Sequence, residues 1–306
     1  MVLRDVSDIV SSMGKDIRSY GLPELNVSAD EISRDYFREL HKEMKIGFDP
    51  KDLEIIPTLN KEQRSGFDMI LSHVLSGKGK VFFVDGPGGT GKMYLYKALL
   101  AKVRSMDLIA VATATSGIAA SIMHGGRTAH SRFKIPIKIS DNAVCNFTKQ
   151  SGTAALMRAA SLIIWDEVGM TRREAVETLD RTLQDIMGSS APFGGKVMVF
   201  GGDFRQVLPV VPRGTRAQIT DATLQHSYLW EKIQKIYLIQ NMRAQNDIWY
   251  SEFLLRIGNG TEVSCENDYV QLPDDIIIEY QSEESLDRLI ESYFLILPSS
   301  VLVVIT

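Results

Sequence analysis

The chain of 306 residues is 44% hydrophobic and 24% charged, and its formal net charge is -4. Such a chain can bury one or two ordinary cores, so disorder throughout is excluded. The acidic balance excludes a broadly basic surface but permits a local basic groove, so nucleic acid is neither implied nor forbidden as a partner.

The first 55 residues are expected to form a helical N-terminal extension. Two segments, SDIVSSMGKDIRSYG and ADEISRDYFRELHKEMK, have the apolar spacing of short amphipathic helices. From Leu59 the pattern changes, and LNKEQRSGFDMILSHVLSG predicts a longer helix. The apolar run Val81–Val84 then predicts a strand, followed by a glycine-rich loop and a helix over MYLYKALLAKVRS.

Strands and helices alternate along the rest of the predicted domain. Strands are predicted over LIAVATAT, SLIIWDE, KVMVFGGD and KIYLIQ, and helices over SGIAASIM and RREAVETLDRTLQDIMG. Short apolar strands separated by helices predict an α/β fold, with a mostly parallel sheet and helices on both faces. Two longer connections, residues 130–160 and 205–225, are expected as loops at the ligand-binding edge of that sheet.

The stretch GPGGTGKM matches the phosphate-loop template GxxxxGK[ST] except at its last position. Glycines leave room for backbone amides to point at phosphates, and the helix that follows turns its amino end toward the negative charge. Lys92 would reach the terminal phosphates. The residues expected to bind the nucleotide here are Gly86, Gly88, Gly89, Thr90, Gly91, Lys92 and Met93. The alternative is a glycine-rich turn without a ligand.

Two further apolar strands end in polar residues. In LIIWDE, Asp166 would hold Mg²⁺ through its water shell and Glu167 would orient and deprotonate the attacking water. In VMVFGGDFRQVLPVV, Gln206 would sense the terminal phosphate and couple it to another ligand. The alternatives are a solvated acidic turn for the first segment and an ordinary strand and loop for the second.

Six blocks in this order resemble the Pif1 family of DNA helicases, superfamily-one enzymes with RecA-like motor domains, and within it the plant and Helitron-transposon branch. The blocks are LNKEQ, GPGGTGKM, ATATSGIAASIMHGGRTAHSRFKI, IIWDE, GGDFRQVLPVV and QNMRAQ. The resemblance implies a RecA-like P-loop NTPase lobe at residues 56–260. It also implies ATP hydrolysis with Mg²⁺, movement 5′ to 3′ along single-stranded DNA, and roles in DNA repair, recombination and telomere maintenance.

The same resemblance assigns roles to single residues. Gln63 would hydrogen-bond the adenine edge, and Arg243 would act as an arginine finger on the γ-phosphate, joining Lys92, Glu167 and Gln206 as catalytic residues. Phosphate contacts, positive charge and base stacking would come from Thr115, Ser116, Arg127, Arg132, Lys134, His130, Phe133 and Phe204. The alternative is that Phe133 is a core residue and that the cations form a solvated rim.

Two features depart from the family pattern. Met93 replaces the hydroxyl that the family uses on Mg²⁺, and a thioether is a poor ligand for this hard cation. We expect nucleotide binding to survive and hydrolysis to slow about a hundredfold, a loss of ~3 kcal/mol. The resemblance also fades after Asp275, so residues 261–306 are expected to be a divergent segment, with the second motor lobe largely missing. The last piece, YFLILPSSVLVVIT, is expected to be a tail of altered reading frame in preference to the first strand of a missing lobe.

Three functions are compatible with these observations. The first is an ATP-dependent DNA helicase, for which another chain would have to supply the second motor lobe, because translocation needs two lobes. The second is a non-catalytic nucleotide- and DNA-binding remnant of such a helicase. The third, a small-molecule P-loop kinase, fits the phosphate loop but not the other blocks.

Cysteine usage and hydropathy bear on the compartment. Cys145 and Cys265 are far apart and lack metal-ligand spacing, so we expect reduced thiols. The N-terminus MVLRDVSDIV is not a secretory signal, and no run approaches the ~20 apolar residues of a membrane helix. A nuclear protein without a membrane partner is expected, with mitochondria as the alternative location.

Overall fold

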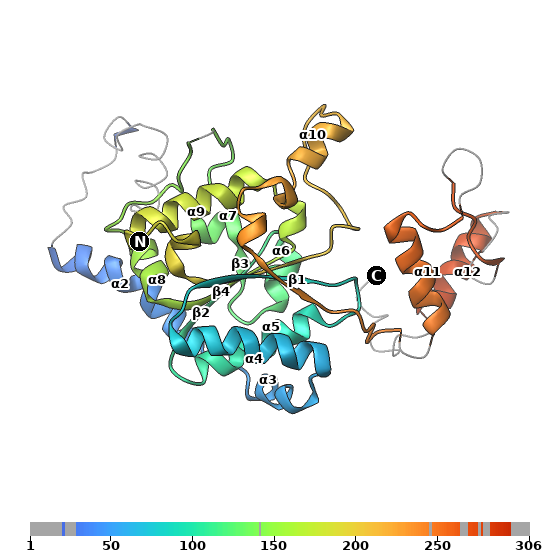
Figure 1. The fold of residues 1–306 in the computed structure, drawn as a ribbon, viewed down its shortest axis with the longest axis horizontal. Coiled ribbons are helices and arrows are strands. Elements are labelled where there is room, and N and C mark those ends of the chain that lie inside the picture. The colour runs from blue at the N-terminus through green and yellow to red at the C-terminus, as the bar shows by residue number, and fades with distance from the viewer. Residues whose placement is uncertain are drawn as a thin grey trace. The chain divides into compact units, whose positions relative to one another are not determined.

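The computed structural model describes residues 20–21, 29–140, 142–244, 247–263, 269–274, 277 and 282–294 (Figure 1). The chain divides into two compact units, Met1–Ile248 and Trp249–Thr306. The expected helix over SDIVSSMGKDIRSYG, apart from Tyr20 and Gly21, and the tail after Phe294 lie outside the described residues. The expected domain boundaries, after residues 55 and 260, stay predictions.

Within the described residues, six parallel strands form one sheet in the order β3-β2-β4-β5-β1-β6. Their bounds are Lys80–Asp85 (β1), Ile109–Ala114 (β2), Arg127–Thr128 (β3), Ala160–Asp166 (β4), Val197–Gly202 (β5) and Gln234–Tyr237 (β6). Strand β5 is buried along its whole length, as expected for a strand covered on both faces. The predicted α/β fold with a mostly parallel sheet is therefore confirmed.

Helices cover both faces of this sheet. Figure 1 shows α4 and α5 on one side and α7, α8 and α9 on the other. Successive residues of β1 alternate between the two cores, since Phe82 packs with the α4–α5 cluster and Phe83 with the α8–α9 cluster. Among the described residues, the helices of this unit are α2 (Ala29–Ile46), α3 (Pro50–Glu54), α4 (Lys61–Ser76), α5 (Lys92–Arg104), α6 (Gly117–Ile122), α7 (Ala129–Phe133), α8 (Gly152–Ala159), α9 (Arg173–Met187) and α10 (Arg216–Asp221).

Short 3-10 turns and two further helices complete the described elements. The turns are η2 (Ile56–Thr58), η3 (Val168–Met170), η4 (Pro192–Gly195), η5 (Leu224–His226) and η6 (Trp230–Lys232). The second unit carries α12 (Glu283–Phe294) and, except for its first residue, α11 (Ile248–Asn259). In α11 the rings of Trp249 and Phe253 stack with their centroids 5.3 Å apart.

The two connections expected as loops contain helices. Helix α8 lies within residues 130–160 and is capped at its amino end by Ser151, whose side chain accepts a hydrogen bond from Ala154 N. Helix α10 lies within residues 205–225 and begins with a capping box formed by Thr215 and Gln218. Both are short, so their apolar periodicity is too brief to stand out in the sequence.

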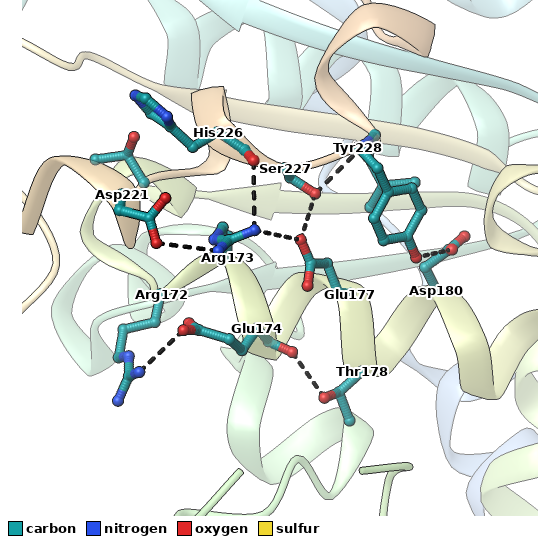
Figure 2. Close-up of polar contacts among 12 residues, drawn as sticks. Arg172, Arg173, Glu174, Glu177, Thr178, Asp180, Asp221, His226, Ser227 and Tyr228 are labelled. Carbon is teal, nitrogen blue, oxygen red and sulfur yellow. Dashed lines mark hydrogen bonds and ion pairs between the residues drawn. The ribbon is translucent and has the colours of Figure 1, made fainter. Parts of the chain in front are cut away.

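A buried polar network fastens α9 to the segment that follows α10 (Figure 2). Asp180 accepts hydrogen bonds from the Tyr228 hydroxyl at 2.7 Å and from Phe193 N at 2.6 Å. Beside it, Glu177 accepts a 2.8 Å hydrogen bond from Ser227. Because buried polar groups are costly when unpaired, these contacts hold the long return from β5 to β6 against the domain.

Candidate functional site

A cavity of about 540 Å³ opens at the carboxyl ends of β1, β4 and β5. Open parallel sheets bind ligands at this edge. The sequence-predicted residues that line it come from five separate segments: Gln63, Gly88, Gly89, Gly91, Lys92, Met93, Asp166, Glu167, Gln206 and Arg243. Thr58, Tyr94 and Asp203 line it as well and were not singled out from the sequence.

The phosphate loop has the backbone shape that its glycines predict. Gly89 and Gly91 have φ angles of 90° and 81°, in the left-handed region that side chains disfavour. A Cβ on Gly91 would lie 2.4 Å from Gln63 Nε2, so a larger residue would clash there. Thr90 is buried, and its hydroxyl donates to Pro87 O at 2.9 Å, which braces the turn from inside.

Lys92 reaches back into the loop. Its Nζ donates to the carbonyl oxygens of Gly86 and, at 3.3 Å, Pro87. Burial lowers the pKa of Lys92, and the nearby carboxylates of Asp166 and Asp203 oppose that shift. A partly desolvated ammonium in a glycine-rich loop at the amino end of α5 is the arrangement that a polyphosphate needs.

The two carboxylates of the acidic strand lie at the end of β4. Asp166 is buried, and burial raises its pKa although Lys92 opposes the shift. Glu167 has φ 56°, a left-handed conformation that is unfavourable for a residue with a side chain. Its Oε2 accepts a 3.3 Å hydrogen bond from Ser116 N. The strained turn thus aims the carboxylate at both the cavity and the start of α6.

Gln63 has two partners within the protein. Its Nε2 donates to Thr90 O at 3.1 Å, and its Oε1 accepts from Asn60 N at 3.1 Å. The amide therefore ties the amino end of α4 to the phosphate loop. The adenine contact expected of Gln63 stays a prediction.

The segment around Arg243 is held directly against the phosphate loop. Met242 N donates to Gly89 O at 2.8 Å, and Asn241 Oδ1 accepts from Arg243 N at 2.9 Å. Gln206 Nε2 donates to Asp203 Oδ2 at 3.4 Å across the cavity wall. Asp203 is buried and follows β5 directly, and an acidic residue immediately after an apolar strand was the sequence signal that could have identified it.

A magnesium ion would find an incomplete set of protein ligands in this cavity. No cluster of three or more His, Cys, Asp or Glu side chains suited to a metal occurs among the described residues. Asp166 Oδ1 is buried without a hydrogen-bond partner among them, and an orphaned carboxylate oxygen is a suitable contact for a hydrated cation. Met93 lines the same cavity and offers only sulfur. The residues present therefore fit a cation that phosphates and water also coordinate.

The expectation that Phe133 stacks on bases is wrong, because its side chain is fully buried. The ring packs in the α8–α9 core, 5.7 Å from that of Trp165. The alternative left open by the sequence, a core residue, is correct. Phe204 is half-buried and stacks on Phe83 at 5.2 Å, while its contact with DNA stays a prediction.

The predicted basic residues have different environments. Arg132 is buried and pairs with Glu43 of α2 at 2.6 Å, so it is not part of a solvated rim. Arg127 is exposed and pairs with Glu39 of α2 at 3.2 Å. The side chains of His130 and Lys134 are exposed. Helix α2 therefore places carboxylates against the block that was expected to hold DNA.

Thr115 and Ser116 make their contacts inside the protein. The Thr115 hydroxyl donates to Glu167 O at 2.8 Å, and its backbone N donates to Asp166 O at 3.0 Å. The Ser116 hydroxyl accepts from Ala119 N at 3.1 Å as the N-cap of α6. Hydrogen bonds thus connect Thr115 and Ser116 to Asp166 and Glu167. The phosphate contacts expected of Thr115 and Ser116 stay predictions.

The structure bears on the expected reduced cysteines and on the expected lack of a membrane helix. Cys145 is buried, and burial raises its pKa to about 11, so its thiol stays protonated near neutral pH. Cys265 lies outside the described residues. Among the helices described, none has the length and hydropathy required to span a membrane.

The sequence of this chain is similar to those of known proteins. The profile of the PIF1-like helicase family matches residues 58–268. The ATP-dependent DNA helicase PIF1 of Danio rerio is 30% identical over 214 residues, which cover 69% of this chain and 32% of that protein. The ATP-dependent DNA helicase PIF3 of Trypanosoma brucei brucei is 35% identical over 130 residues, covering 42% of this chain and 15% of that protein.

Solved structures show the same likeness. The crystal structure of Bacteroides Pif1 bound to single-stranded DNA matches with a TM-score of 0.53 and 26% identity, over 76% of this chain and 49% of that chain. Bacteroides Pif1 in complex with ADP-AlF4 matches with a TM-score of 0.53 and 26% identity, over 67% and 47%. This chain spans half or less of these relatives. Since the family profile covers more than half of the sequence and the fold agrees, the chain belongs to the PIF1-like helicase family.

Proposed function

We propose that this chain is the nucleotide-binding motor lobe of an ATP-dependent DNA helicase, able to bind ATP and to engage single-stranded DNA. The observation that carries the proposal is the shared cavity, where Lys92, Glu167 and Arg243 meet although they come from distant parts of the sequence. A solved relative bound to single-stranded DNA and another bound to ADP-AlF4 support both ligands.

The cavity can act on a triphosphate through residues already in place. Phosphate oxygens would replace the carbonyls of Gly86 and Pro87 as partners of Lys92. Glu167 would accept the proton of the attacking water, and Arg243 would stabilise the negative charge that develops on the γ-phosphate. Mg²⁺, when bound, would neutralise charge between the phosphates and Asp166.

The contact between Ser116 and Glu167 offers a route from DNA to hydrolysis. A strand lying against the start of α6 would shift the backbone amide that holds Glu167 Oε2. The carboxylate would then turn toward the cavity, so hydrolysis would depend on DNA. Movement in the 5′-to-3′ direction, a second motor lobe from another chain, and nuclear roles in repair, recombination and telomere maintenance belong to this proposal.

Met93 favours one second candidate, a non-catalytic module that binds nucleotide and DNA. The residue lines the cavity where a hydroxyl would contact the metal, and sulfur is unsuited to magnesium. Under this alternative the cavity still holds ATP but turns it over no faster than a chain without Glu167.

Phosphate release from ATP, measured with and without single-stranded DNA, separates the two candidates. The helicase lobe should release phosphate faster with DNA, and both Lys92→Ala and Glu167→Gln should abolish the increase. Met93→Thr should raise the rate about a hundredfold, since ~3 kcal/mol of barrier is restored. A natural chain that binds ATP but matches Glu167→Gln in rate would establish the non-catalytic module. Equal rates for Met93→Thr and the natural chain would refute the assigned effect of Met93.

A further inference from the structure

Tyr96 lies beneath the phosphate loop, on the second turn of α5, and is fully buried. Its hydroxyl reaches the carboxyl ends of the central strands. A Cβ built on Gly201 of β5 would lie 1.8 Å from Tyr96 Oη and 2.7 Å from Asp166 Oδ1. The phenol and the carboxylate therefore meet in the space that the missing side chain of Gly201 leaves.

These two oxygens have no other partner in the described part of the chain, since neither Tyr96 Oη nor Asp166 Oδ1 makes a regular hydrogen bond there. Buried polar atoms are almost always paired, and a phenol can donate to a carboxylate that can only accept. A phenol is protonated near neutral pH, so Tyr96 can donate its proton to the carboxylate of Asp166.

We propose that Tyr96 is a positioning residue whose phenol donates to Asp166 Oδ1 and thereby orients this carboxylate toward the nucleotide cavity. Asp166 lines that cavity, so its orientation sets where a metal-bound water can attach. The inference rests on the proposed function, because it concerns how the same site holds Mg²⁺ and ATP.

Met93 lines the same cavity and offers it no hydroxyl. Met93 and Tyr96 are three positions apart on α5, so they lie on neighbouring parts of one helix face. Of the two hydroxyls on α5, that of Tyr94 already pairs with Thr58 Oγ1 at 2.5 Å. On this helix, the hydroxyl of Tyr96 is therefore the one that can donate a hydrogen bond to Asp166, because the side chain of Met93 ends in a thioether.

The test measures how much Mg²⁺ tightens the binding of a non-hydrolysable ATP analogue, as the ratio of Kd in EDTA to Kd in Mg²⁺. Titration calorimetry would compare the natural chain, Tyr96→Phe, Met93→Thr and the double variant. A hydrogen bond to a charged group is worth ~1.5 kcal/mol, so Tyr96→Phe should lower the ratio about tenfold. In the Met93→Thr background the same change should lower it less than about twofold, because a hydroxyl again stands beside the metal.

Tyr228→Phe is the matched control, because it also removes a phenol from a buried carboxylate, that of Asp180 at 2.7 Å (Figure 2). Asp180 does not line the cavity, so this variant should keep the natural ratio. An equal loss in Tyr96→Phe and Tyr228→Phe, or in both backgrounds at position 93, would overturn the positioning role. So would a natural chain whose affinity ignores Mg²⁺. A natural chain that binds no analogue under either condition would overturn the proposed function as well.

Discussion

The ion cluster between α2 and the sheet domain sets up a sharp test of how the N-terminal segment is held. Glu43 lies between Arg132 at 2.6 Å and Arg104 at 3.6 Å, and the exposed fractions of these side chains are 2%, 3% and 5%. Burial raises the pKa of Glu43 although both guanidinium groups oppose the shift. The free-energy cost of desolvating these three groups therefore offsets much of their electrostatic attraction. Removing one partner leaves the desolvation cost of the others uncompensated.

Replacing Glu43 by Gln leaves the buried guanidinium group of Arg104 without its counter-charge and leaves Arg132 with only the partly exposed Glu39, at 3.6 Å. At an effective dielectric constant of about 20, the two lost attractions amount to ~6 and ~5 kcal/mol before relaxation. Measured losses for one partner of a buried pair are ~3–5 kcal/mol. For a domain of this size that loss lowers the Tm by roughly 6–20 °C, which thermal unfolding followed by circular dichroism would detect.

A matched control lies one helical turn earlier on α2. Glu39 pairs with the exposed Arg127 at 3.2 Å and with Arg132 at 3.6 Å, but its own side chain is 30% exposed and Arg132 keeps Glu43, so Glu39→Gln should cost only about 1 kcal/mol. Combining Glu43→Gln with Arg132→Met should cost less than the sum of the single changes, because an unpaired charge disappears. If Glu43→Gln costs no more than Glu39→Gln, the cluster is not buried and the reasoning fails.

Three further predictions follow from single sites. Phe133→Ala should lower the free energy of unfolding by ~3–5 kcal/mol, measured by thermal unfolding, without a specific loss of affinity for single-stranded DNA. A folded variant that fails to bind DNA would show that Phe133 contacts DNA after all. Glu39→Gln removes the counter-charge of Arg127, so fluorescence anisotropy titrations at low salt should show tighter binding of single-stranded DNA. An unchanged Kd would show that Arg127 does not contact the DNA. Burial lowers the pKa of Lys196 from 10.5 to about 8, so the unfolded chain binds more protons between these values and stability should rise with pH across that window. In urea unfolding, the free energy of unfolding of the natural chain relative to that of Lys196→Met should therefore rise with pH across this window, and parallel pH profiles of the two chains would contradict the shift.

The phosphate loop and the acidic strand could be predicted because their chemistry is local. Left-handed turns at Gly89 and Gly91 need residues without a Cβ, and apolar runs such as that of β4 form strands covered on both faces. The order of these elements along the chain then required a parallel sheet whose carboxyl edge gathers the polar strand ends. Arg243 was grouped with Lys92 on a different basis, the resemblance to the Pif1 family, and the structure places both residues at the same cavity.

Burial could not be predicted for residues whose type suits both the surface and the interior. Phe133 and Arg132 are neighbours on α7, and only the packing of α7 against the sheet and of α2 above it shows that both are buried. The same is true of Asp203. The sequence places it in the block GGDFRQ, but only the structure shows that it lines the cavity.

The sequence by itself therefore determined the nucleotide-binding loop, the parallel sheet and the family, because each depends on residue types at short, regular spacing. The tertiary structure decided which side chains meet, above all Tyr96 with Asp166 beside Gly201 and Glu43 with two arginines. Those contacts join elements far apart in the chain, and their free energy comes from desolvation and geometry that no local pattern of letters encodes.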